Sequence, residues 1–257
     1  KISVYYFLSF LSMHTTGFST LITKLKASPS PKTINPITFL FQSEWVGIGH
    51  GWHRESSQFL IAEWMNKLWI CEIKLTRIRS TIDEEIFEDN PMEYIRRDLE
   101  QSIEIDTRRR AACEFVRALL EQFSTQITTI CSRHIQMYLA EYQASPAQNW
   151  KRKDAAIYLL TSIAAQSSTM QHGVSSTNAL VDVVQFFSEH VLEDLQPDNS
   201  IARAQPILQV DAIKYLYTFR NQLTKEQLLS VLPLLVHHLS SSNYVTCTYA
   251  AISIERI

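Results

Sequence analysis

Glycine is scarce in this sequence and is concentrated near its start. Only five glycines occur among 257 residues, and four of them lie within the first 51. Three of the eight prolines, at positions 29, 31 and 36, lie there too, so residues 28–55 are expected to form a loop or an irregular connection. Gly173 is the only glycine in the rest of the chain, where the pattern turns helical.

The sequence also lacks the short motifs on which most enzyme and cofactor sites are built. It has no G-x-S-x-G and no G-K-[ST], and its early glycines do not follow the G-x-G-x-x-G spacing. The four cysteines lie far apart and form no C-x-x-C pair, which argues against a zinc or redox motif. His50 and His53 with Glu55 would make only a weak metal site without further ligands. We therefore expect no enzyme, no cofactor and no metal, with reduced thiols as in the nucleus or cytosol.

Long apolar runs and a strong net charge are missing as well. The opening string, KISVYYFLSFLSM, contains a largely apolar run about a dozen residues long, whereas a membrane span needs about 20. The lysine before this run leaves a signal-peptide core as an alternative, although no A-x-A-like site follows it. The net charge is −2 and 46% of the residues are apolar. We therefore expect a globular chain that binds neither membranes nor nucleic acid.

What the sequence does contain is helical periodicity. In residues 56–79, apolar side chains recur every three to five positions, as one buried helix face requires. From residue 107 onward, seven amphipathic segments follow one another: DTRRRAACEFVRALLEQF, TQITTICSRHIQMYLAEY, NWKRKDAAIYLLTSIAAQ, TNALVDVVQFFSEHVLEDL, PILQVDAIKYLYTFRNQL, TKEQLLSVLPLLVHHLS and NYVTCTYAAISIERI. These segments predict helix pairs joined by short turns. No alternating pattern predicts a strand between them.

Small residues recur in the first helix of each predicted pair. The segment that begins at Ala111 aligns with segments at Ala155, Asp211 and Ala250, at offsets of 44, 56 and 39 residues. These offsets bracket the period of about 40–47 residues found in HEAT and armadillo arrays. An isolated pair cannot bury its apolar face, so neighbouring pairs must stack. We predict an all-α fold, a HEAT-repeat α-solenoid over residues 56–257, after a poorly assigned segment of residues 1–55.

A short acidic segment interrupts the helical pattern at residues 83–106. It carries ten Asp/Glu and two Arg, whereas residues 1–82 carry four Asp/Glu against nine Lys/Arg. Ten carboxylates would repel one another if buried, so the segment must be solvated or must face a basic partner. A solvated loop is the usual outcome for such a charge run. We interpret the segment instead as an insertion in the array that reaches for a protein partner.

Five strings, taken in order, carry a resemblance to a known family. They are FEDNPMEYIRRDLE, DTRRRAAC, NWKRKDAAIYLLTS, DAIKYLYTFRNQLTKEQLL and TYAAISIER. Over about residues 83–257 their ordered combination resembles the importin-alpha re-exporters, the cellular apoptosis susceptibility family of the importin-beta superfamily. Residues 1 to about 70 show no such resemblance. The resemblance implies a right-handed superhelix, part of a longer array, that shuttles between nucleus and cytoplasm and binds importin-alpha with Ran-GTP. Nuclear pore proteins are expected as further partners.

The resemblance also implies a role for the acidic insertion. In the family, an acidic insertion in a central HEAT repeat is implicated in contacts with Ran and importin-alpha and in a hinge of the ring. The predicted partner-binding residues are Asp83, Glu84, Glu85, Glu88, Asp89, Glu93, Arg96 and Arg97. The alternative is a generic HEAT-repeat scaffold that serves another protein complex.

A second set of residues is expected to tie the insertion to the scaffold. Three arginines begin a helix, where positive charge is unfavourable against the helix dipole and needs compensation. The set comprises Asp98, Glu100, Glu104, Asp106, Arg108, Arg109 and Arg110. Arg96 and Arg97 are expected to pair in the same way with Glu84, Glu85, Glu88 or Asp89. The family's Asp-Leu-Glu-Gly-Ser-Asp turn loses its glycine here and gains a residue before Asp106, so this turn is expected to be stiffer or re-routed.

Overall fold

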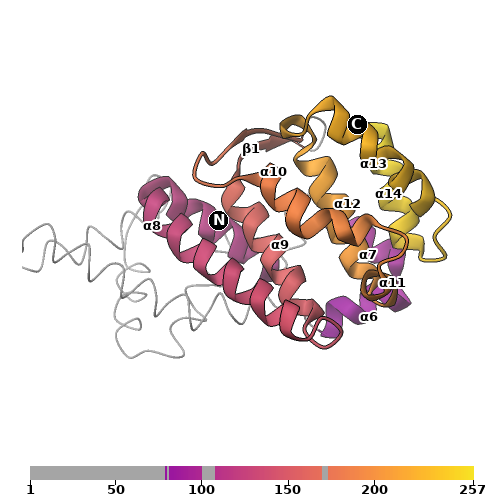
Figure 1. The fold of residues 1–257 in the computed structure, drawn as a ribbon. Coiled ribbons are helices and arrows are strands. Elements are labelled where there is room, and N and C mark those ends of the chain that lie inside the picture. The colour runs from indigo at the N-terminus through magenta and orange to yellow at the C-terminus, as the bar shows by residue number, and fades with distance from the viewer. Residues whose placement is uncertain (1–78, 80, 100–107, 170–172) are drawn as a thin grey trace, which may run out of the picture.

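The computed structural model describes residue 79 and residues 81–99, 108–169 and 173–257 (Figure 1). The loop predicted at residues 28–55 lies outside the described residues. So do the division at residue 55 and nearly all of the helix predicted at residues 56–79.

Helices dominate the described residues. In chain order they are α6 (Thr81–Asp89), α7 (Pro91–Leu99), α8 (Arg108–Ala144), α9 (Trp150–Ala164), α10 (Val183–Phe186), the π-helix η2 (Phe187–Val191), the 3₁₀-helix η3 (Leu192–Leu195), α11 (Ser200–Ala204), α12 (Pro206–Thr218), the 3₁₀-helix η4 (Arg220–Gln222), α13 (Lys225–His238) and α14 (Tyr244–Arg256). None of the helices in these ranges is both long enough and apolar enough to cross a membrane.

The first two predicted helices after residue 107 form one continuous segment. Helix α8 runs through both, and Phe123 has non-helical backbone angles inside it, φ −135° and ψ 47°. The change of direction therefore falls where the sequence left almost no room for a linker. Only a local kink separates the two helical stretches.

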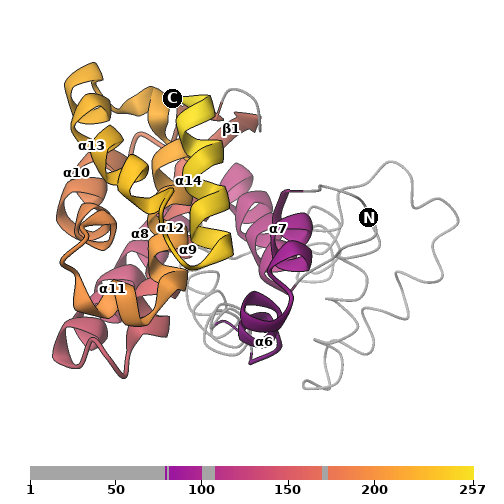
Figure 2. The same cartoon turned by 90° about the vertical axis from the view of Figure 1, so that its right-hand side faces the viewer.

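The described helices form three layers. Helices α9, α12 and α14 make the middle row, with α12 in contact with both of the others. The elements η2, η3 and α13 contact this row from one side, and α6 and α7 lie on its other side (Figure 2). Helix α8 packs along α9. The row of first helices is thus covered on both faces.

Small side chains allow the middle row to pack closely. Ala155 and Ala156 in α9, Ala212 in α12 and Ala250 in α14 are completely buried. All four lie within the first two positions of the repeat segments that begin at Ala155, Asp211 and Ala250. Close packing requires them because a larger side chain would hold neighbouring backbones apart.

One expectation was wrong, because the described chain contains two strands. Strands β1 (Ala165–Thr169) and β2 (Gly173–Thr177) pair in antiparallel fashion, with an irregular register. The buried Val174 holds the hairpin to the scaffold, since its carbonyl accepts a hydrogen bond of 2.9 Å from the side chain of Gln222. These strands are short and rich in Ser and Thr. Tertiary contacts hold the two strands in place, and the sequence has no alternation of apolar and polar residues that would predict them.

Candidate protein-interaction site

The acidic segment folds into two short helices with an apolar inner face. Asn90 separates them, and its side-chain oxygen accepts a hydrogen bond of 3.2 Å from the backbone N–H of Glu93. Phe87 and Ile95 are buried, and the rings of Phe87 and Tyr94 meet edge to face with centroids 5.0 Å apart. Residues 83–99 are therefore not a solvated loop. Burial of these apolar side chains docks α6 and α7 on the scaffold.

The outer surface of this unit is acidic with two apolar side chains. Glu85, Glu88 and Asp89 are exposed on α6. Ile82 and Met92 are each 61% exposed. A surface of carboxylates beside exposed apolar side chains can contact a basic protein partner, because the charges attract it and the apolar groups become buried on contact.

Other carboxylates of the unit bind the scaffold instead. Glu84 of α6 accepts a hydrogen bond of 2.5 Å from the ammonium of Lys151 at the start of α9. Asp98 of α7 pairs with Lys214 of α12 at 2.7 Å and also accepts a hydrogen bond from the Tyr249 hydroxyl of α14. These contacts join α6 and α7 to all three helices of the middle row.

Glu93 lies between two arginines of its own helix. Its carboxylate accepts hydrogen bonds from Arg96 at 2.8 and 3.0 Å and from Arg97 at 2.7 Å. Hydrogen bonds from Arg96, and then from Arg97, lower the pKa of Glu93 to about 2. The structure thus pairs both arginines with Glu93, whereas the sequence suggested partners on α6.

A buried ion cluster lies beneath the unit. Arg79 donates hydrogen bonds to Asp154 of α9 at 2.7 Å, to Asp211 of α12 at 3.3 Å and to the Tyr94 hydroxyl at 2.7 Å. Arg109 at the start of α8 reaches the other oxygen of Asp154 at 2.5 Å. The Asp154 side chain is completely buried, and that of Arg79 is only 4% exposed. Such charges are stable only when every partner is present.

The two aspartates of the cluster hold different charges. Burial alone would raise the pKa of Asp154, but the guanidinium groups of Arg109 and Arg79 outweigh it and hold that pKa well below its usual value. Burial and the neighbouring Asp154 carboxylate raise the pKa of Asp211 well above its usual value. Among the described residues, Asp154 contacts Arg79 and Arg109 closely, whereas Asp211 contacts Arg79 alone and at longer range, so Asp154 keeps the negative charge.

The Asp98 contact is also ionised. The side chain of Asp98 is 32% exposed, and its partial desolvation opposes the charge, but the ammonium of Lys214 and the hydrogen bonds from Lys214 and Tyr249 lower its pKa overall. Burial likewise opposes the charge of Lys214, and Asp98 outweighs it, so the pKa of Lys214 is raised. The pair is therefore a charged attachment point at neutral pH.

The residues predicted from the sequence fall into three groups. Glu100, Glu104 and Asp106 lie outside the described residues, and Arg108 and Arg110 belong to α8 without described side chains. Asp98 and Arg109 were expected to take part in pairs between the insertion and the start of the next helix. Instead, Asp98 contacts Lys214 and Arg109 contacts Asp154. The partner-binding set lies together on α6 and α7, and its role stays a prediction.

Sequence reasoning missed Arg79, Asp154, Asp211, Lys214 and Tyr249. One signal was available, since Asp154 and Asp211 directly precede Ala155 and Ala212 in the buried repeat positions. An aspartate beside a closely packed alanine is buried and needs a cation. No group of three His, Cys, Asp or Glu side chains in the described ranges could hold a metal ion.

Comparison with known proteins identifies the family. The Cse1 family model matches residues 56–254. Exportin-2 of Danio rerio is 53% identical over 175 residues, and Exportin-2 of Pagrus major and of Homo sapiens are 52% and 50% identical over the same length. Each alignment covers 68% of this chain and 18% of the relative. The chain thus spans about a fifth of the length of these relatives.

A solved structure shows the same fold. The protein described as "The exportin Cse1 in its cargo-free, cytoplasmic state" matches with a TM-score of 0.72 and 45% sequence identity. The match covers 76% of this chain and 21% of that one. This likeness confirms the predicted HEAT-repeat solenoid. The resemblance read from the five strings is confirmed too, and the chain belongs to the Cse1 family.

Proposed function

We propose that this chain is part of a nuclear export receptor that binds importin-alpha cooperatively with Ran-GTP and shuttles between nucleus and cytoplasm. Its identity of about half with the Exportin-2 relatives supports an exportin. The proposal that the chain binds importin-alpha with Ran-GTP rests on the docked α6–α7 unit, whose exposed carboxylates face away from the scaffold. Nuclear pore proteins belong to the proposal as further partners, with no residue assigned to them.

The structure narrows the set of partner-binding residues. Glu84 and Asp98 already bind lysines of the scaffold, and Glu93 is paired with Arg96 and Arg97. Glu85, Glu88 and Asp89 are exposed on α6. We therefore assign the first electrostatic contact with a basic partner to these three carboxylates. Long-range attraction of this kind mainly raises the association rate and selects the correct partner.

A pull-down with the full-length protein tests the proposal. Importin-alpha is captured with and without GTP-loaded Ran, and we expect efficient capture only when Ran-GTP is present. The triple variant Glu85→Lys, Glu88→Lys, Asp89→Lys should weaken capture and reduce its dependence on salt. Glu121→Lys, an exposed position on α8, is the single-site control and should capture as the wild type does.

Two results would each contradict one part of the proposal. Cargo capture that ignores Ran would favour a generic HEAT-repeat scaffold. Capture that is unchanged in the triple variant would remove α6 from the interface and leave the exportin assignment standing.

A further inference from the structure

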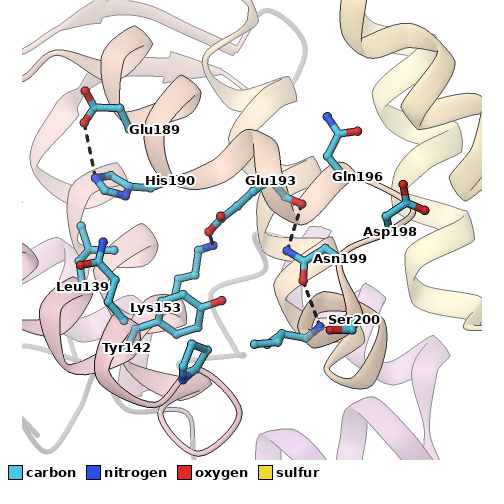
Figure 3. A pocket seen from close by; sticks show the side chains of 13 residues that line it. Leu139, Tyr142, Lys153, Glu189, His190, Glu193, Gln196, Asp198, Asn199 and Ser200 are labelled. Atoms are coloured by element: carbon cyan, nitrogen blue, oxygen red, sulfur yellow. Dashed lines mark hydrogen bonds and ion pairs between the residues drawn. The ribbon is translucent and has the colours of Figure 1, made fainter.

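A cavity lies in a different part of the fold from the α6–α7 unit. Its volume is about 600 Å³, and it opens between the C-terminal end of α8, α9, the η2–η3 segment and the start of α11 (Figure 3). Figure 2 places α10 and α11 on the other side of the middle row from α6 and α7. Contacts made in this cavity are therefore separate from those of the acidic α6 surface.

The cavity has an apolar wall. Leu139 and Tyr142 of α8, Pro146 of the following turn and Ile201 of α11 line it. Leu139 and Tyr142 are each 7% exposed, so the wall belongs to the packed core and is held in place. A rigid wall of this kind suits the methylene groups of a long side chain.

The rim of the cavity is acidic. Glu189, Glu193 and Asp198 line it and are exposed. Among the described lining residues Lys153 is the only lysine or arginine, and its ammonium is already paired with Asp194 at 2.9 Å and with Glu193. His190 adds little positive charge at neutral pH, because burial lowers its pKa. The cavity therefore carries a net negative charge.

We propose that this cavity receives an arginine side chain from a basic segment of a protein partner. The apolar wall covers the methylene groups, and a rim carboxylate, Glu189 on one side or Asp198 on the other (Figure 3), accepts hydrogen bonds from the guanidinium, which is planar and weakly hydrated. Among the described residues, Asp198 forms no ion pair, and Glu189 accepts a hydrogen bond of 2.8 Å from the Gln185 side chain and lies 3.7 Å from His190, so neither carboxylate is paired with a lysine or arginine there. Both carboxylates can therefore accept a new cation while the Lys153 ion pairs stay intact. The site goes beyond the proposed function, because it uses other residues on another surface.

Fluorescence anisotropy of the full chain with a fluorescein-labelled hexa-arginine peptide tests the proposal. The double variant Glu189→Gln, Asp198→Asn should bind the peptide about fivefold more weakly, as expected for two partly exposed carboxylates. The control Glu121→Gln, Glu255→Gln removes the same charge at exposed positions outside the cavity and should bind as the wild type does. A hexa-citrulline peptide, which is neutral and of equal length, should not bind.

A steric variant separates insertion into the cavity from diffuse attraction. Ser200→Trp narrows the mouth without changing the charge, and Gln143→Trp does so from α8 as a second choice if the first variant does not fold by circular dichroism. Binding lost in the steric variant supports the proposal. If the steric variant binds like the wild type, or if the charge control loses as much affinity as the rim variant, the peptide is held only by net charge and the proposal is wrong.

Discussion

Asp154 and Asp211 both contact Arg79 beneath the α6–α7 unit, yet we expect opposite results when each is changed to asparagine. Asp154 is completely buried and holds Arg79 at 2.7 Å and Arg109 at 2.5 Å. Loss of one partner from a buried ion pair costs about 3–5 kcal/mol. Asp211 can ionise once the neighbouring charge is gone, and it already contacts Arg79 at 3.3 Å. Asp154→Asn should therefore cost about 3 kcal/mol, the lower end of that range.

Asp211→Asn should cost far less at neutral pH. The folded-state pKa of Asp211 is raised, so above an unfolded value of about 3.9 the folded chain binds more protons at this site than the unfolded chain. The contribution of Asp211 to stability therefore falls as pH rises toward the folded-state pKa. Asparagine resembles the protonated carboxyl in shape and removes this loss. The variant should match or exceed the wild type in stability at pH 8.

Urea unfolding and thermal unfolding, each followed by circular dichroism between pH 5 and 8, measure the effect of the two aspartate variants on stability. Asp154→Asn should lower the unfolding free energy at every pH in this window and reduce Tm by roughly 6–12 °C for a domain of this size. Glu93→Gln removes the two surface ion pairs with Arg96 and Arg97 and serves as the surface control, with a loss much smaller than that of Asp154→Asn expected because solvent screens exposed pairs. Equal losses for the two aspartate variants, or a loss below about 1 kcal/mol for Asp154→Asn, would refute the assigned charges.

Two further predictions concern the hairpin and a buried histidine. Gly173 has a φ of +70°, and a Cβ there would lie 2.5 Å from Nη1 of Arg220 and 2.9 Å from the Thr218 carbonyl oxygen, so Gly173→Ala should lower the unfolding free energy by about 2 kcal/mol or more in urea titrations. A Gly173→Ala variant as stable as the wild type would contradict the observed turn. Burial lowers the pKa of His238, whose ring nitrogen donates to the Leu195 carbonyl at 3.0 Å. Stability should therefore fall as pH drops through about 6.5, and His238→Gln should reduce this slope between pH 7 and 5; an unchanged slope would exclude His238 as its source.

Much of the helical part of the fold could be predicted from the sequence, because it depends on near neighbours. The capping box of α13 is an example, since Thr224 and Gln227 exchange hydrogen bonds across three residues. Asn243 caps α14 in the same local way. The alanines at positions 155, 156, 212 and 250 gave the stacking of the first helices. Each of these features can be read within one turn or one repeat.

The hairpin and the ion cluster could not be read in this way. Val174 meets Gln222 across 48 positions, and Arg79 meets Asp211 across 132. Asp98 reaches Tyr249 across 151 positions. No local pattern encodes such pairs, because both partners are ordinary polar residues until the chain brings them together. The pairing of Arg96 and Arg97 with Glu93 is different, because it lies within one helical turn, and the i,i+3 and i,i+4 spacing could have predicted it.

The sequence by itself determined that the chain forms stacked helix pairs and carries one acidic segment, since period and composition are local properties. Tertiary structure decided which of the acidic side chains are available to a partner. Packing of α6 and α7 on the middle row commits Glu84 and Asp98 to lysines and leaves Glu85, Glu88 and Asp89 exposed. The sequence determines which side chains are charged. The partner of each charge depends on distances that exist only in the folded chain.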